Sequence, residues 1–199
     1  MSLFDNNRTV GLALIVVGLI NLILGIGVAA WEHTASSVAY GIANLIFGVL
    51  VLLFGIKVRN GSNDKVAILS GLVRVIGIST ILSAIFSAAG AYLADKDLGI
   101  GAAIGAVIIS IILGLILLWI AAKISGKNVN VISKVIWILL VIIFVLLVLS
   151  SIVTFVVALG DIDTATGILS AIAALALIFV YVYALIATIS KEVQSSLGI

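Results

Sequence analysis

The chain has 199 residues, of which 64% are apolar and only 9% are charged. A soluble domain carries about 25% charged residues, so this composition excludes a water-soluble globular fold and indicates an integral membrane protein. The chain has no cysteine and a single histidine, His33, which excludes disulfides, thiol catalysis and paired-histidine metal or haem sites. We therefore expect no cofactor and no metal, with the lipid bilayer as the main partner and no nucleic acid.

Six apolar segments follow one another along the chain, each close to the length of about 20 residues that crosses a bilayer as a helix. We predict an all-α fold with six transmembrane helices at Val10–Trp31, Tyr40–Ile56, Val75–Ala94, Leu98–Ala122, Val135–Leu159 and Thr166–Ile189. The second segment is short, and a start near Ser37 is the alternative. The first segment is too long for the apolar part of a secretory signal, so we expect it to stay in the mature protein.

Positive charge is concentrated on one side of these segments. Lys96 falls on one side, whereas nine cations share the other: Arg8, Lys57, Arg59, Lys65, Arg74, Lys123, Lys127, Lys134 and Lys191. Because cytoplasmic loops carry the excess of lysine and arginine, we predict a multi-pass cell-membrane protein with both termini in the cytoplasm. Two N-glycosylation sequons lie on the same inner side, so we expect neither to be used and favour a prokaryotic source.

The sequence repeats at an interval of about 66 residues, which is the signature of stacked structural units. This interval carries Gly11 onto Gly77 and Gly48 onto Gly114. The simplest interpretation is a single membrane domain, residues 1–199, made of three tandem helical hairpins at approximately residues 1–62, 63–127 and 128–199. Internal repeats are frequent in membrane proteins, transporters included, so the repeat alone does not indicate transport.

Arg74 has apolar residues on both sides. An arginine inside a membrane segment is by default a functional candidate. The repeat aligns Arg74 with Arg8, which opens the first predicted helix, and the segment Val75–Ala94 is long enough to cross the bilayer without it. We therefore predict Arg74 at the cytoplasmic membrane edge, where its side chain can snorkel, and we expect Lys65–Val73 to be an interfacial or overhanging helical segment.

Glycines recur every seven residues in the first two predicted helices, at Gly11, Gly18 and Gly25 and at Gly41, Gly48 and Gly55. Seven residues are close to two helical turns, so each set lies on one face of its helix. An antiparallel hairpin that places Gly18 opposite Gly48 also pairs the remaining glycines of the two sets. Small residues let membrane helices approach closely, so the pattern predicts a tightly packed seam.

An asparagine interrupts the apolar run of each of these helices, at Asn21 and Asn44. The same register makes the two amides neighbours, and a hydrogen bond between them would satisfy groups that are costly to leave unpaired in hydrocarbon. The repeat carries them onto Ser87 and Ser110 in the second hairpin, where Gly114 is retained. We interpret this set as a helix seam, with ligand or ion contact by the two asparagines as the alternative.

The remaining polar residues do not assemble into a reactive site. All eight carboxylates fall at segment ends or in connections, whereas proton relays across membranes use buried acidic groups or histidines. The adjacent Glu32 and His33 lie in an outer turn, where such a pair is more often solvated than catalytic. Two aspartate pairs could attract external cations but lack the ligands of a calcium loop: Asp95 with Asp97, and Asp161 with Asp163. We expect no catalytic residue and no enzyme activity.

Two interpretations of function follow. The first is a non-catalytic polytopic protein, a structural or scaffolding subunit of a larger membrane assembly or of a homo-oligomer. It fits the short connections, the lack of a soluble domain and the small-residue faces. The alternative is a channel or facilitator for a small neutral solute or ion, which fits the repeat and the asparagine and serine positions. The first predicts a dry seam at Asn21 and Asn44, and the second predicts a continuous polar path.

Overall fold

The computed structural model describes residues 6–31, 35–61, 64–94, 100–126 and 132–199 of the chain. Within these ranges every regular element is an α-helix: α1 (Asn7–Trp31), α2 (Ala35–Asn60), α3 (Lys65–Ala94), α4 (Ile100–Ser125), α5 (Ile132–Gly160), α6 (Ala165–Ile189) and α7 (Lys191–Leu197). The first six have 25 to 30 residues, and each is long and apolar enough to cross a membrane.

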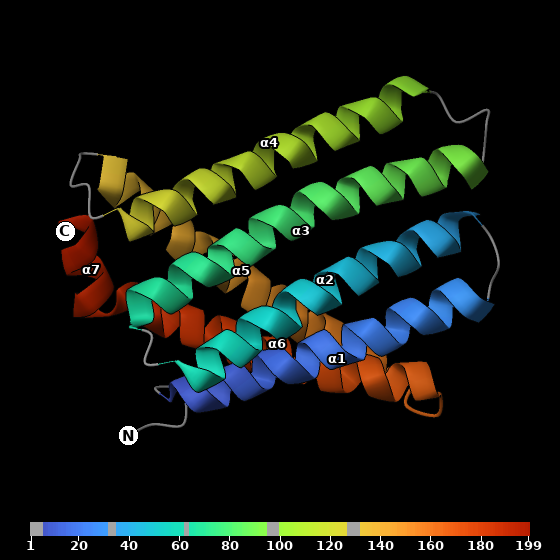
Figure 1. The fold of residues 1–199 in the computed structure, drawn as a ribbon, viewed down its shortest axis with the longest axis horizontal. Coiled ribbons are helices and arrows are strands. Elements are labelled where there is room, and N and C mark those ends of the chain that lie inside the picture. Colours follow the sequence, from blue (N-terminus) through green and yellow to red (C-terminus); the bar gives the residue numbers. More distant parts are fainter. Residues whose placement is uncertain (1–5, 32–34, 62–63, 95–99, 127–131) are drawn as a thin grey trace.

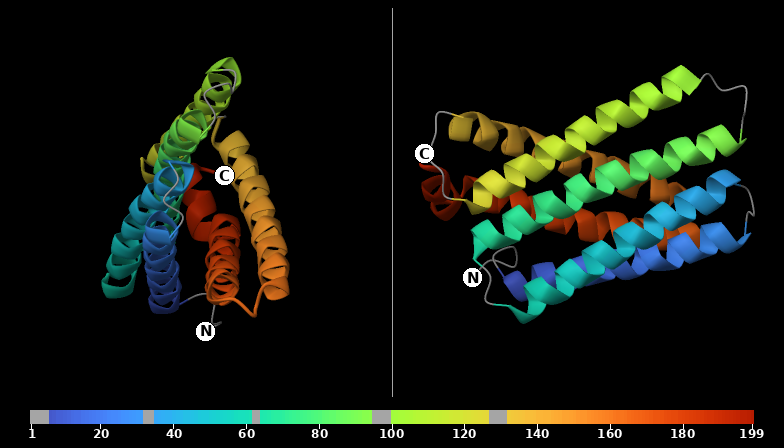
Figure 2. Two further views of the ribbon diagram at one scale, coloured as in Figure 1. Left: turned by 90° about the vertical axis from the view of Figure 1, so that its right-hand side faces the viewer. Right: turned by 45° about the horizontal axis from the view of Figure 1, so that its top comes forward.

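The six long helices pack as three hairpins, α1 with α2, α3 with α4 and α5 with α6. Figure 1 shows α1 to α4 side by side in one layer, with α5 and α6 crossing behind it. The end-on view in Figure 2 places α5 and α6 on one side of that layer. Helix α6 joins the two layers because it contacts α1 and α3 as well as α5. The start of α1 and the C-terminal helix α7 lie at the same end of the bundle, which we call the terminus end (Figure 1).

The hydrophobic core that the hairpins share lies in the half of the bundle nearest the terminus end. In α1, α3 and α5 its buried residues lie in the first half of the helix, at positions 10–17, 68–73 and 136–144. In α2, α4 and α6 they lie in the second half, at positions 51–58, 120–124 and 180–187. Helix α7 adds Val193 and Leu197. Only 22% of the candidate spans in α4 and in α5 is buried, against 44% in α6. Helices α4 and α5 therefore form the least covered edges of the molecule.

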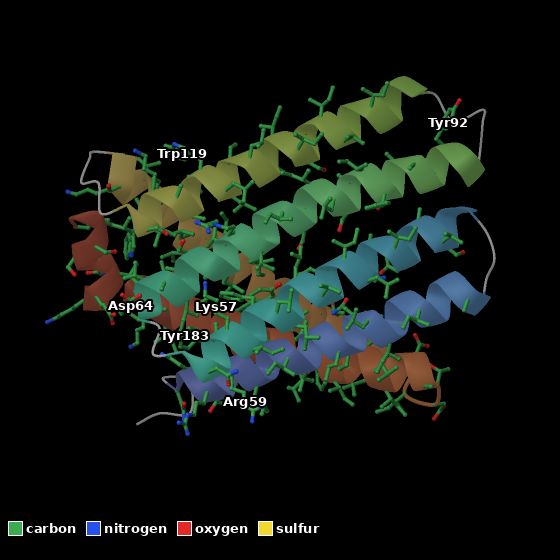
Figure 3. The ribbon with its side chains drawn as sticks, in the orientation of Figure 1. Lys57, Arg59, Asp64, Tyr92, Trp119 and Tyr183 are labelled. Carbon is green, nitrogen blue, oxygen red and sulfur yellow. The ribbon has the colours of Figure 1, made fainter. Side chains whose placement is uncertain are left out.

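Charged and aromatic side chains mark the two ends of the bundle. Figure 3 shows Lys57 and Arg59 at the terminus end, with Trp119 and Tyr183 near that end and Tyr92 at the opposite end. Aromatic residues at both levels are typical of the two membrane–water interfaces, and the cations are typical of the cytoplasmic one. The cytoplasmic orientation of the terminus end stays a prediction from this charge pattern.

Two helices begin five or more residues before the spans that the sequence pattern predicts. Helix α2 begins at Ala35 rather than Tyr40 and runs to Asn60, since serines and alanines continue its helix without the hydropathy of a membrane segment. Helix α3 begins at Lys65 and continues through Arg74 without a break. The segment Lys65–Val73, expected as an interfacial or overhanging helix, is thus helical. Ile68 in its first turns is 1% exposed and belongs to the shared core, so these turns pack within the bundle.

The short helix α7 is absent from the sequence prediction. Ser190 caps its start by accepting a hydrogen bond from the Val193 backbone, and Gly198 ends it in the left-handed conformation at φ 70°. Val193 and Leu197 are buried in the shared core, so α7 closes the terminus end of the bundle. The signals were present: a capping serine, Glu192 in the first turn and a glycine directly after the last turn.

Candidate functional site

The α1–α2 hairpin brings the expected glycine pairs face to face. A methyl carbon added at Gly48 would lie 2.8 Å from the carbonyl oxygen of Gly18 and 2.9 Å from the backbone nitrogen of Leu22. Contacts of the same kind recur at both ends of the seam, between Gly25 and Gly41 and between Gly11 and Gly55. The two backbones are therefore in contact along the seam, and no larger residue fits without moving a helix.

Asn21 and Asn44 do not form the hydrogen bond expected between them. The side-chain nitrogen of Asn21 instead donates to the carbonyl of Val17, one turn earlier in its own helix, at 2.8 Å. Both asparagines are described and partly buried, and no hydrogen bond joins them within the described part of the chain. The expected polar link across the seam is wrong because a helical asparagine can satisfy its amide on the preceding turn of its own backbone.

The second hairpin packs in a different register from the first. The repeat would place Gly114 opposite Ala84, but Gly114 lies against the Gly77 carbonyl, seven positions earlier in α3. The hydroxyl of Ser70 confirms this displaced register because it donates to the carbonyl of Ala121 at 2.9 Å. The first turns of α3 have no counterpart in α1, and their pairing with the end of α4 shifts the contact by two helical turns.

This displacement separates Ser87 from Ser110. With Gly77 opposite Gly114, Ser110 is level with Ile81 rather than with Ser87. Ser87 is also exposed, whereas Ser110 is partly buried. The two serines that the repeat aligns with Asn21 and Asn44 therefore do not form a matching polar pair in the second hairpin.

Arg74 lies inside α3 and not at its start. Its side chain is exposed, and its guanidinium makes no hydrogen bond or ion pair with any residue that the structure describes. The preceding turns of α3 pack against α4, α6 and α7, so Arg74 belongs to the outer surface of a continuous helix. The helical turns expected before Arg74 are present, and its place at the cytoplasmic membrane edge stays a prediction.

Three polar contacts that sequence reasoning missed tie the terminus end together. The buried Ser70 hydroxyl lies 2.6 Å from the Ser125 hydroxyl in α4. The Tyr183 hydroxyl of α6 donates to the side-chain oxygen of Asn7 at the start of α1, at 3.2 Å. The indole nitrogen of Trp137 in α5 donates to the Thr188 carbonyl at 2.9 Å. Each joins residues more than 50 positions apart on different helices, and spacing along one helix gives no signal for such pairs.

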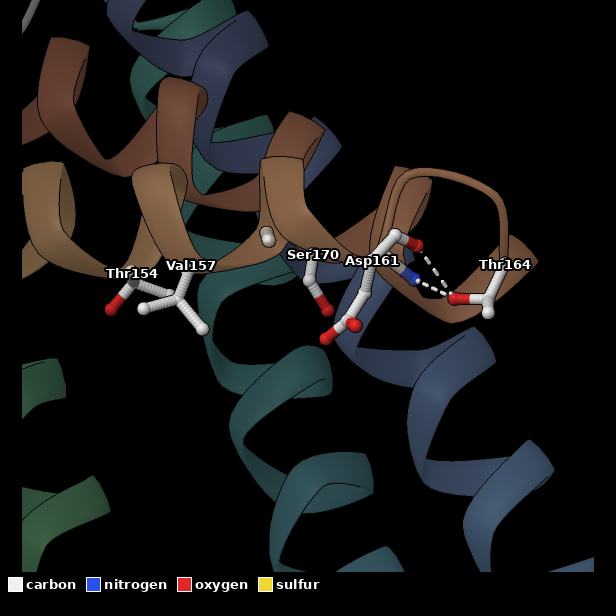
Figure 4. A pocket seen from close by; sticks show the side chains of 7 residues that line it. Thr154, Val157, Asp161, Thr164 and Ser170 are labelled. Carbon is white, nitrogen blue, oxygen red and sulfur yellow. Dashed lines mark hydrogen bonds between the residues drawn. The ribbon is translucent and has the colours of Figure 1, made fainter.

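A pocket of about 460 Å³ lies at the opposite end of the bundle, where α5 ends and α6 begins. Its lining consists of Thr154, Val157, Ala158, Asp161, Thr164, Gly167 and Ser170. Figure 4 shows the side chains of Thr154, Asp161 and Ser170 directed to the same side of the hairpin. The polar part of this lining consists of hydroxyl groups and one carboxylate.

Most hydroxyls of this pocket serve the local backbone. The Thr164 hydroxyl donates to the Asp161 carbonyl and accepts from the Gly167 backbone nitrogen, both at 2.9 Å, which caps the start of α6. The Thr154 hydroxyl donates to the Ser150 carbonyl at 3.0 Å. Thr154 and Thr164 thus have their donors in use, and the pocket offers a ligand mainly acceptor groups.

No group of three or more His, Cys, Asp or Glu side chains that could hold a metal ion occurs among the described residues. The pairs Glu32 with His33 and Asp95 with Asp97 lie outside the described residues, whereas Asp161 and Asp163 are both exposed in the turn between α5 and α6.

Six long apolar helices packed as hairpins define the class of this chain: it is a multi-pass helical membrane protein. Comparison with protein-family models, with curated proteins and with solved structures found no match to the chain.

Proposed function

We propose that the protein is a non-catalytic membrane subunit that acts by packing laterally against copies of itself or against other membrane chains. The observation that carries this proposal is the uneven coverage of the bundle. Helices α4 and α5 present large apolar side chains, such as Ile109 at 61% and Val153 at 62% exposure. Partner helices on these faces would gain the dispersion contacts that drive helix association in lipid.

The geometry of the first hairpin supports a structural role over a conducting one. Its two backbones touch at Gly18 and Gly48, and the amide of Asn21 is satisfied within its own helix. A solute path along this seam would have to separate backbones that are in contact. The seam therefore supports the assembly of a rigid hairpin.

A second candidate function is a channel or facilitator for a small neutral solute or ion, and the pocket between α5 and α6 favours it. Asp161 and Ser170 would be the first polar groups that an entering solute meets. To cross the membrane, the solute would then have to pass the shared core, where Phe144 and Tyr183 are 0% and 1% exposed. This closed core makes the channel the weaker of the two proposals.

Single-cysteine variants test the subunit proposal, since the chain has no native cysteine. Ile112 and Ile120 both lie on α4, but Ile112 is 51% exposed and Ile120 is 0% exposed. In native membranes, Ile112→Cys should cross-link to a second chain under mild oxidation or with a short bifunctional reagent, and Ile120→Cys should not.

A flux assay tests the alternative that the protein is a channel or facilitator. The purified chain in liposomes should leave the permeability to small neutral solutes and monovalent ions at the level of protein-free liposomes. A monomer that does not cross-link and that raises solute flux would refute the subunit proposal in favour of the channel.

A further inference from the structure

The pocket between α5 and α6 ends inside the hairpin. Ala158 on α5 and Gly167 on α6 belong to its lining. On the same helical faces, seven residues nearer the shared core, lie Ser151 and Ala174. These two residues are only 6% and 1% exposed, so the two helices are closely packed at that level. The pocket is therefore a recess that does not continue between the helices toward the shared core.

The polar lining of this recess presents hydrogen-bond acceptors. The Thr154 and Thr164 hydroxyls donate to the backbone carbonyls of Ser150 and Asp161, so they have no proton left to donate to a ligand. The Asp161 carboxylate is exposed and makes no hydrogen bond or ion pair with any residue that the structure describes. An ionised carboxylate accepts hydrogen bonds and donates none. The recess therefore suits a ligand that carries donors and a positive charge.

Ser170, the apolar lining and the volume define the rest of the ligand. The Ser170 side chain is partly buried, and Figure 4 shows it directed to the same side of the hairpin as Asp161. Val157, Ala158 and Gly167 supply the apolar lining. The volume of about 460 Å³ lies within the range of small-molecule sites, and the described residues hold no cluster of three metal-ligating side chains. An organic cation with an apolar body therefore fits the recess better than a bare metal ion.

We propose that this recess binds a primary ammonium group carried on a short apolar chain. An ammonium has three donors and no acceptor, which matches the Asp161 carboxylate and the hydroxyl oxygens of the lining. The bond to the carboxylate is charge-assisted and therefore the strongest of these contacts, while Val157 and Ala158 offer an apolar surface to the chain. Soluble amines and the ethanolamine headgroup of a phospholipid share this chemistry. The inference depends on neither the subunit nor the channel proposal.

Titration of the full chain with n-butylammonium chloride tests this site. The isotope-labelled protein in detergent micelles would be followed through the amide signals of Gly167 and Ser170, which both line the recess. We expect saturable shifts of these signals, and Asp161→Asn should weaken binding about tenfold, as loss of a charge-assisted hydrogen bond predicts. Asp163→Asn is the matched control, because Asp163 is exposed in the same turn but does not line the recess. Its affinity should stay within about twofold of wild type, since salt screens an exposed charge.

A second cation tests the ligand class on wild type alone. Tetramethylammonium carries the same charge without an N–H donor, so it should bind much more weakly than butylammonium. Equal affinity for the two cations would overturn the match to a primary ammonium. Equal losses in Asp161→Asn and Asp163→Asn would mean unspecific attraction to the acidic turn and would overturn the site. Unchanged thermal unfolding of both variants excludes a folding defect as the cause of a loss.

Two short-chain lipids, added to the micelles in turn, identify the source of the ammonium. If phosphatidylethanolamine shifts the same amide signals and phosphatidylcholine does not, the site takes a lipid headgroup. If butylammonium shifts them and neither lipid does, the site takes a soluble amine. Both results support the recess as an ammonium site. Amide signals that do not respond to butylammonium, or that respond equally to the two lipids, would overturn it.

Discussion

Substitution of Gly48 by alanine should destabilise the first hairpin. The added methyl carbon would lie 2.8 Å from the Gly18 carbonyl oxygen and 2.9 Å from both the backbone nitrogen and Cγ of Leu22. Two of these three atoms are backbone, so α1 and α2 must move apart. Overpacking of this kind costs about 1–3 kcal/mol, and the better helix propensity of alanine returns at most about 1 kcal/mol. With the full return, the net loss is up to about 2 kcal/mol.

The chain supplies a matched control for this substitution. A methyl carbon at Gly27 in α1 would meet nothing within 4 Å, so Gly27→Ala should leave stability unchanged or raise it slightly. Both variants and wild type would be unfolded reversibly in mixed micelles of a mild detergent and dodecyl sulfate, followed by circular dichroism. If Gly48→Ala proves as stable as Gly27→Ala, the backbones do not touch as described and the steric account of the seam fails.

Three other substitutions test polar contacts. Ser70→Ala should lower stability by about 1 kcal/mol, seen in the same unfolding assay, because the Ala121 carbonyl loses its donor from α3; no change would argue against the displaced register. Tyr183→Phe should speed amide hydrogen exchange in the first turn of α1 without changing exchange in α4, because it releases the tie between α6 and α1. A double-mutant cycle of Asn21→Ala with Asn44→Ala should give a coupling below about 0.5 kcal/mol, and a larger coupling would restore the direct bond between them.

The register of the first hairpin was predictable from sequence because steric limits alone determine it. Three glycines on each helix, spaced by seven, allow close approach in one alignment, and the structure shows the backbone contact at Gly18 and Gly48. The six spans were predictable for a similar reason, since apolar length and the absence of proline leave few other folds in a bilayer.

The second hairpin could not be predicted in the same way. Alanines replace two of the glycines in α3, so Gly77 and Gly114 are left as the pair that permits contact, and they select a register of their own. The repeat predicts the register of the second hairpin from that of the first. It does not predict the turns that α3 has in addition to those of α1. The sequence likewise shows that Asn21 is polar but not where its amide bonds, because an intrahelical acceptor is always available.

The pocket and the terminus-end contacts depend on which helices become neighbours. The Tyr183 hydroxyl donates a hydrogen bond to Asn7, which lies 176 positions away in the sequence. No sequence pattern within either helix predicts this pair. Asp161 and Thr154 belong to the same helix end, but Ser170 joins them only because α6 folds back along α5.

One helix of a hairpin can be displaced along the other and still turn the same face toward it. Seven residues advance an α-helix by almost two whole turns and about 10 Å, so α3 has changed its height against α4 without rotating about its axis. A shift of five residues would instead rotate the contacting face of α3 by about 140° and turn Gly77 away from Gly114. Length changes in multiples of seven are thus a route by which one helix of a hairpin can change its height against the other while its packing face is preserved.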